Sequence, residues 1–233
     1  MTKYAANAML ASKISFINEI ANIAKGLGAD INQVRLGIGS DKRIGYDFIY
    51  PGIGFGGSCF PKDLSALEKM GESVDYNPDL IKSISKINQY QKEKFANDII
   101  DRLSENSNSL NNIKIAVWGL TFKPETDDLR NAPSIDILNN LLNKGAIVHA
   151  TDPRASENNI AKVIKGGNFH FSTNQYDIVK DAECLLLLTE WREFRSPDFN
   201  KVKSLMKKPI IFDGRNLYNR SELEALGFEL HQI

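Results

Sequence analysis

The sequence predicts an α/β protein with an α-helical part, residues 1–106, followed by a doubly wound parallel sheet, residues 107–233. Three observations predict this fold class. Apolar residues at helical spacing fill the first hundred positions. Residues 104–112 are polar and carry no apolar pattern, which places a boundary near 106. Beyond them short apolar runs alternate with helical stretches, as in a parallel sheet that is covered on both faces.

Two long helices, over residues 4–25 and 79–103, are expected to dominate the helical part. Asp30 has the side chain of a helix cap and predicts a shorter helix that runs to about Leu36. The stretch 61–70 predicts another. The first helix starts without a capping residue, which suggests that the chain begins inside an element. Long helices of this kind commonly pair with a second subunit.

The second part alternates expected strands and helices. Strands are expected at 113–118, 146–150, 169–171, 184–188, 209–212 and 228–231, and helices at 134–143, 157–165, 174–180, 198–206 and 221–226. Cys184 lies within an apolar run and is expected in the core. Ligands of such sheets bind at the carboxyl ends of the strands, where Lys123 and Arg215 could hold phosphate or carboxylate.

The glycine pattern after the first expected strand departs from that of a dinucleotide site. Gly119 is the one glycine there, whereas the usual fingerprint is G-x-G-x-x-G. A standard NAD site is therefore not expected in this half. A nucleotide-type ligand stays open.

Residues 54–63, Gly-Phe-Gly-Gly-Ser-Cys-Phe-Pro-Lys-Asp, form the most distinctive stretch of the chain. Its glycines let the backbone approach a ligand, and Pro61 suits the first turn of a helix. Cys59 is therefore expected on a loop at the mouth of a helix, where the helix dipole and Lys62 favour the thiolate. Asp63 follows one turn later and is expected on the same side. The competing interpretation is a buried cysteine beside a turn.

Composition narrows the class of protein. The formal net charge is zero, with 42% hydrophobic and 25% charged residues, so neither nucleic acid nor an anionic membrane is expected as a partner. No apolar run reaches membrane-spanning length. The two cysteines occupy unlike contexts, which favours a reduced, cytoplasmic protein.

Several segments resemble the UDP-glucose 6-dehydrogenase family in order and spacing, over essentially all 233 residues. The stretch 54–63 is similar to its catalytic-cysteine motif. The other matching segments are Lys3 to Ala8, Arg43 to Gly45, Gly119 to Lys123, Asp128 to Arg130 and Phe212 to Arg215.

The resemblance implies an NAD-dependent, metal-free, two-step oxidation of UDP-glucose to UDP-glucuronate. Cys59 would attack the C6 aldehyde, and the adduct would be oxidised to a thioester that water hydrolyses. Lys3 and Asn7 would hold the oxyanion or a water, and Asp63 would position the hydrolytic water or Lys3.

The resemblance also implies binding residues. Those expected to bind substrate are Arg43 (across a homodimer formed by the central helices), Phe48, Tyr50, Gly52, Gly54, Phe55, Gly56, Phe122, Lys123 and Arg215. Lys62 and Arg130 are expected to contact NAD. The family's N-terminal NAD-binding domain does not match this chain, so the chain is expected to be a fragment without turnover of its own.

Two alternatives accompany this interpretation. One is a GDP-mannose 6-dehydrogenase, which shares the cysteine chemistry. The other is a nucleotide-sugar-binding and dimerisation module without activity. Lys3 and Asn7 could also be solvated surface residues, and so could Lys123, Arg130 and Arg215.

Overall fold

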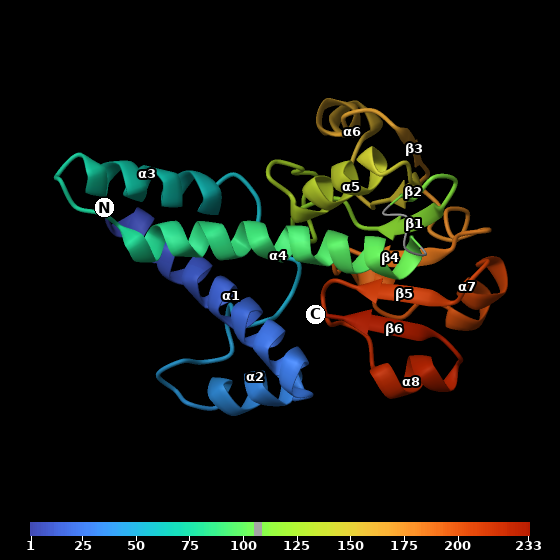
Figure 1. The fold of residues 1–233 in the computed structure, drawn as a ribbon, viewed down its shortest axis with the longest axis horizontal. Coiled ribbons are helices and arrows are strands. Elements are labelled where there is room, and N and C mark those ends of the chain that lie inside the picture. The colour runs from blue at the N-terminus through green and yellow to red at the C-terminus, as the bar shows by residue number, and fades with distance from the viewer. Residues whose placement is uncertain (105–108) are drawn as a thin grey trace.

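The structure is a computed structural model that describes residues 1–104 and 109–233. A group of helices lies beside a sheet flanked by helices, and the C-terminus lies between the two (Figure 1). The predicted boundary at 106 falls outside the described residues. No helix among the described residues is both long and apolar enough to cross a membrane.

Four helices form the first part, and all four were predicted. They are α1 (Thr2–Leu27), α2 (Ile31–Gly39), α3 (Phe60–Glu72) and α4 (Asp79–Leu103). Gly28 ends α1 in a left-handed conformation, φ 70°, and the Asp30 side chain caps α2 by accepting from the Asn32 amide. The helix α2 runs three residues beyond its predicted end.

The second part is a six-stranded sheet of order β3-β2-β1-β4-β5-β6. Every neighbouring pair is parallel, which confirms the doubly wound fold. The strands are β1 (Lys114–Trp118), β2 (Ile147–Thr151), β3 (Asn168–Phe171), β4 (Cys184–Leu187), β5 (Ile210–Asp213) and β6 (Glu229–Gln232). The helices are α5 (Pro133–Asn143), α6 (Glu157–Val163), α7 (Phe199–Leu205), α8 (Arg220–Ala225) and the 3₁₀ helix η1 (Arg192–Phe194).

One predicted helix is wrong. In place of the helix expected at 174–180, residues 175–181 form consecutive turns, and Asn174 precedes them and accepts from the Tyr176 amide. An Asn side chain that bonds the backbone two residues on favours a turn over a helix. Ile178 and Val179 are buried all the same, because the turns pack them onto the sheet.

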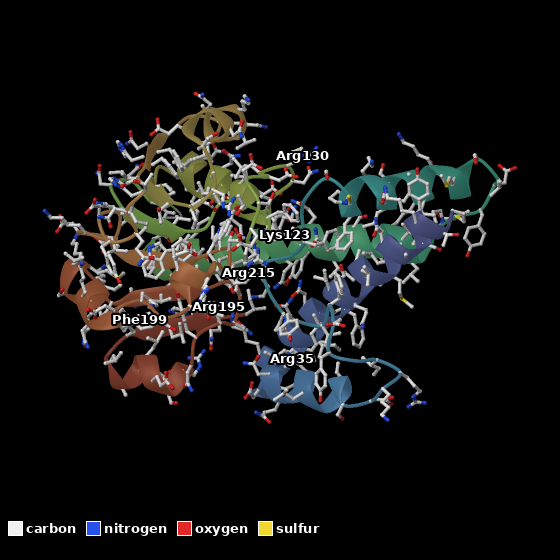
Figure 2. The ribbon with its side chains drawn as sticks, turned by 180° about the vertical axis from the view of Figure 1, so that it is seen from behind. Arg35, Lys123, Arg130, Arg195, Phe199 and Arg215 are labelled. Carbon is white, nitrogen blue, oxygen red and sulfur yellow. The ribbon has the colours of Figure 1, made fainter. Side chains whose placement is uncertain are left out.

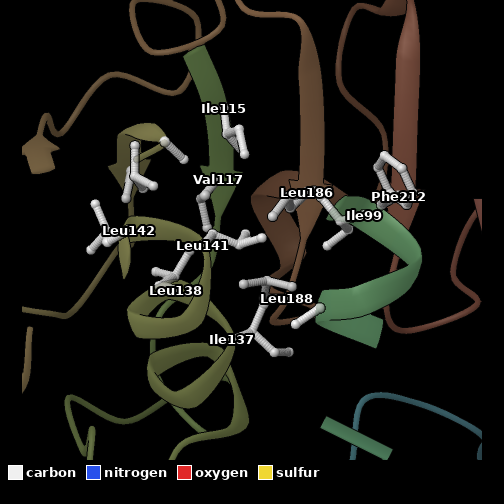
Figure 3. Packing of buried hydrophobic residues seen from close by; sticks show 14 of the residues in the cluster. Ile99, Ile115, Val117, Ile137, Leu138, Leu141, Leu142, Leu186, Leu188 and Phe212 are labelled. Carbon is white, nitrogen blue, oxygen red and sulfur yellow. The ribbon is translucent and has the colours of Figure 1, made fainter. Parts of the chain in front are cut away.

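The helix α4 joins the two parts. Its second half lies against the sheet, where Ile99 packs in one cluster with Leu186 and Phe212 (Figure 3). Phe95 meets the Phe212 ring edge-on, with centroids 6.4 Å apart. The first half of α4 packs on α1 and α3. The helix α4 therefore connects the helical part to the sheet near the carboxyl ends of β4 and β5.

Candidate active site

Residues 52–57, called the glycine segment below, pass between the helices and the sheet and are buried along their whole length. The Ile53 amide donates to the Gly214 carbonyl at 3.1 Å, and the Gly57 amide to the Arg130 carbonyl at 2.9 Å. A Cβ at Gly56 would collide with the Asn131 carbonyl oxygen. The segment can pass here because it lacks that side chain.

Cys59 follows the glycine segment and is the N-cap of α3, as predicted. Its side chain is exposed, and its sulfur lies 3.8 Å from the Ser58 hydroxyl. Cys184 is fully buried in β4, also as predicted, and burial raises the pKa of its thiol. One of the two thiols is therefore available for chemistry.

Asp63 lies one turn further along α3 and is fully buried. Asn7 Nδ2 donates to its Oδ2 at 2.6 Å, and Lys3 Nζ lies 3.5 Å from the same oxygen. The Asn7 hydrogen bond lowers the pKa of Asp63 most, and the charges of Lys3 and Lys62 add to it against the opposing effect of burial. The carboxylate is thus ionised and anchors both α1 side chains.

The thiol and this carboxylate point in different directions. Cys59 is exposed, whereas Asp63 faces α1, and among the described residues no hydrogen bond joins the two side chains. Cys59 and Asp63 lie one helical turn apart, as expected, but their side chains do not form a direct contact with each other.

Arg130 lies near the thiol. Its guanidinium pairs with Asp128 at 2.7 Å, which raises the pKa of Arg130 most, and the charge of Cys59 adds to the effect. Lys62 is exposed in the first turn of α3. The site therefore places two cationic side chains, Arg130 and Lys62, near Cys59.

Arg215 borders the glycine segment from the sheet side, since a Cβ at Gly52 would lie 3.7 Å from its Nη1. Figure 2 shows Lys123 and Arg215 along the seam between the helices and the sheet. Lys123 is exposed, with Nζ 5.4 Å from the Phe122 ring centroid. Arg215 is 15% exposed, donates from Nε to the Leu188 carbonyl at 2.7 Å and pairs with Glu190 at 3.2 Å. Its Nη2 is buried without a hydrogen-bond partner among the described residues, so this guanidinium has capacity for a ligand.

The remaining predicted binding residues differ in exposure. Phe48, at φ 63°, and Tyr50 are exposed, and the Arg35 guanidinium lies 4.4 Å from the Tyr50 ring centroid. Arg43 is 89% exposed and pairs with Asp41, so it is not brought to Cys59 within this chain. The rest face protein: Gly52, Gly54, Phe55 and Gly56 are buried.

The end of β1 is closed to a dinucleotide. Asp152, directly after β2, accepts hydrogen bonds from the amides of Leu120 and Thr121 at 2.7 and 3.0 Å and from Trp191 Nε1 at 3.1 Å. In a dinucleotide site an acidic residue near this position binds the ribose instead. The residues at this crevice therefore do not fit NAD, in line with the missing glycine fingerprint.

Sequence inspection missed several residues around the site. Asn18, Asn88 and Gln91 hold the glycine segment, Arg35 stacks on Tyr50, and Asp152 organises the loop after β1. A signal was present in α4, where Asn88 and Gln91 interrupt the buried stripe that includes Ile84 and Phe95. An amide on a buried helix face needs a partner, which points to a neighbouring backbone.

Comparison with known proteins shows the family of the chain. The central domain of the UDP-glucose/GDP-mannose dehydrogenase family matches residues 1–90, and the UDP binding domain of the same family matches residues 116–220. The chain belongs to this family. Its two matched regions correspond to the helical part and the sheet.

Curated relatives carry a more specific name. The chain is 45% identical to UDP-glucose 6-dehydrogenase TuaD of Bacillus subtilis over 233 residues and 44% identical to a UDP-glucose 6-dehydrogenase of Pseudomonas aeruginosa over 231 residues. These alignments cover 100% and 97% of this chain but 49% and 50% of the relatives. The chain thus spans about half the length of the curated relatives it matches.

Solved structures give the same result. A UDP-glucose dehydrogenase from Pyrobaculum islandicum superimposes with a TM-score of 0.83 at 32% identity and covers all of this chain and 50% of its own. A GDP-mannose dehydrogenase from Pseudomonas aeruginosa superimposes with a TM-score of 0.62 at 26% identity. That alignment covers all of this chain and 52% of the chain of the solved structure. Dehydrogenases named for different sugar nucleotides therefore share this architecture.

The Asn7–Asp63 hydrogen bond is expected to stabilise the fold in a pH-dependent way. Because it lowers the pKa of Asp63 below the ordinary value of 3.8, its contribution is present above that pH and is lost as the pH falls through the folded-state pKa. Asn7→Ala should lower the melting temperature by about 5 °C at pH 7 and by much less at pH 3.

Thermal unfolding followed by circular dichroism at the two pH values measures this difference. Asn158→Ala, at an exposed position of α6, is the matched control and should behave as the unmodified chain. Equal losses at pH 7 and pH 3 would contradict the assignment.

Proposed function

We propose that this chain supplies the covalent site and the sugar-nucleotide site of an NAD-dependent UDP-glucose 6-dehydrogenase. One observation carries the proposal: an exposed thiol begins α3 one turn before a buried carboxylate that anchors Lys3 and Asn7. The family match and the names of the curated relatives support the reaction and the substrate.

In the proposed reaction the Cys59 thiolate adds to the C6 aldehyde of the oxidised sugar. A carbon–sulfur bond forms, and the carbonyl electron pair becomes an oxyanion that takes up a proton. Lys3, 64% exposed and held by Asp63, and Asn7 would donate to this oxygen. Oxidation of the adduct leaves a thioester, and attack by water releases the carboxylate and restores the thiol.

The oxidation requires a hydride acceptor, and NAD supplies that chemistry when it is bound. The sheet of this chain does not fit NAD because Asp152 closes its crevice. We therefore place the cofactor in a part of the protein outside these residues, with Lys62 and Arg130 as its proposed contacts from this chain.

The sugar nucleotide is proposed to lie along the seam between the helices and the sheet. Lys123 and Arg215 would bind its diphosphate, while Phe122 and the exposed rings of Phe48 and Tyr50 would contact the sugar and base. The buried, unpaired Nη2 of Arg215 supports a ligand there.

Calorimetric titration of the chain without NAD tests this site. UDP-glucose and UDP-glucuronate are expected to bind, and GDP-mannose is not. Lys123→Ala should weaken binding of UDP-glucose by about tenfold because it removes one charge-assisted contact to phosphate. Lys162→Ala, on exposed α6, is the control. Preferential binding of GDP-mannose would overturn the substrate and leave the cysteine chemistry in place.

Turnover tests the thiol. In the protein that combines this chain with an NAD site, Cys59→Ala should reduce turnover by at least about a thousandfold, because the covalent adduct cannot form. Cys184→Ala, at the buried cysteine, should retain activity. Initial rates of NADH formation measure both. Near-normal turnover of the Cys59 variant would refute the mechanism.

A homodimer through α1 and α4 is proposed as well. Met9, Phe16 and Ile23 lie seven residues apart on α1 and are 64%, 53% and 53% exposed. Beside them lies an apolar groove of about 450 Å³ lined by residues that include Ile44 and Leu80. Such a large apolar surface is typical of a subunit interface.

Phe16→Glu should therefore convert the dimer to a monomer, because it buries a charge in the interface. Light scattering after size exclusion gives the mass. Glu157→Ala, at an exposed position of α6 outside the groove, should leave the dimer intact. A monomeric unmodified chain at micromolar concentration would contradict the proposed interface.

The second candidate is a binding and dimerisation module without turnover. The closed crevice beside Asp152 favours it for the isolated chain. The chain alone should thus bind UDP-glucose but reduce no NAD.

A further inference from the structure

Buried amide side chains hold the backbone of the glycine segment from the helical side. Asn88 of α4 accepts from the Phe55 amide at 2.8 Å and donates to the Phe55 carbonyl at 3.0 Å. Gln91 Nε2 donates to the Gly52 carbonyl at 2.9 Å, and Asn18 Oδ1 accepts from the Gly52 amide at 2.8 Å. We call Asn18, Asn88 and Gln91 the amide clamp.

The side chains of the clamp are buried, and a further hydrogen bond fixes the orientation of the Gln91 amide. Its three side chains are 0%, 6% and 2% exposed, in that order. Asn22 Nδ2 donates to Gln91 Oε1 at 2.8 Å, which directs the Gln91 amide nitrogen toward Gly52. A buried amide is costly unless its hydrogen bonds are made. Asn88 and Gln91 pair both their amide oxygen and their amide nitrogen, whereas Asn18 pairs its oxygen and its Nδ2 has no partner among the described residues. The paired amides favour one backbone conformation of the segment.

A contact between two aromatic rings connects the residues that the clamp holds to the residue next to Cys59. The Phe55 ring, whose own backbone is held on both sides by Asn88, meets the Phe60 ring edge-on at 5.7 Å and 82°. Phe60 is the first residue of α3 and follows Cys59 directly. Gly54, at φ +104°, leaves room for the clamp, since a Cβ there would lie 2.7 Å from Asn88 Oδ1.

We propose that Asn18, Asn88 and Gln91 are positioning residues that set the place of the Cys59 thiol relative to Lys3 and Arg130. The catalytic meaning of this placement rests on the function proposed above for Cys59. Covalent catalysis is sensitive to such placement, because a displacement of about 1 Å can cost about 100-fold in rate.

Alkylation of Cys59 by iodoacetamide tests the clamp without turnover. Under native conditions the chain should react at one thiol, Cys59, and Cys184 should react only after unfolding, which gives an internal check on folding. Asn88→Ala should keep this stoichiometry, change the rate at Cys59 about tenfold and shift the pH midpoint of alkylation. Gln89→Ala is the matched control, since Gln89 is the exposed neighbour that bonds Glu93.

The alkylation rates can either support or overturn the proposed role of the clamp. A changed Cys59 rate in Asn88→Ala and in Gly54→Ala, with Gln89→Ala unchanged, supports the clamp. A lowered melting temperature with unchanged rate and pH profile shows a structural role only and overturns it.

A measurement on the unmodified chain covers the case in which the variants do not fold. The amide protons of Gly52 and Phe55 should exchange at least about 100-fold more slowly than in an unstructured peptide. Fast exchange at both would refute the clamp. If Cys59→Ala keeps turnover, the proposed function fails, while the alkylation result still decides the clamp.

Discussion

The passage of the glycine segment between two packed surfaces is the constraint on which the rest of the structure depends. On one side the backbone bonds Asn18, Asn88 and Gln91, and on the other it bonds the carbonyls of Gly214 and Arg130. A side chain at Gly56 would collide with the Asn131 carbonyl oxygen. The helices and the sheet can approach this closely because Gly52, Gly54, Gly56 and Gly57 have no side chains and because the backbone of the segment is hydrogen-bonded on both sides.

This packing also determines which groups can meet. The helix α4 spans both parts, and its Phe95 and Ile99 belong to the core of the sheet. This packing therefore determines where the start of α3 lies relative to the carboxyl ends of β4 and β5. Arg215 and Phe122 from the sheet part border the segment that leads to Cys59. A ligand bound in the seam would touch both parts at once.

The sheet has the topology of a dinucleotide-binding domain but uses its crevice differently. Asp152 is occupied by backbone amides and Trp191, and Gly56 packs against Asn131 and Pro133, where α5 begins. In a dinucleotide domain the helix after the first strand presents its N-terminus to a phosphate. In this chain protein groups fill that region, which is why we propose the seam beside Lys123 and Arg215 for the ligand.

The sequence by itself determined the helices, the strands, the parallel sheet and the position of Cys59 at a helix start, because periodicity, caps and glycines act locally. It also identified Lys3, Asn7 and Asp63 through a family resemblance. It failed at 174–180, where Asn174 favours turns. Only the tertiary structure decided that Asp63 turns inward to Asn7 and that Asn88 bonds Phe55. The partners lie 56 and 33 residues apart. Such pairs depend on how α1, α3 and α4 pack, which no local pattern specifies.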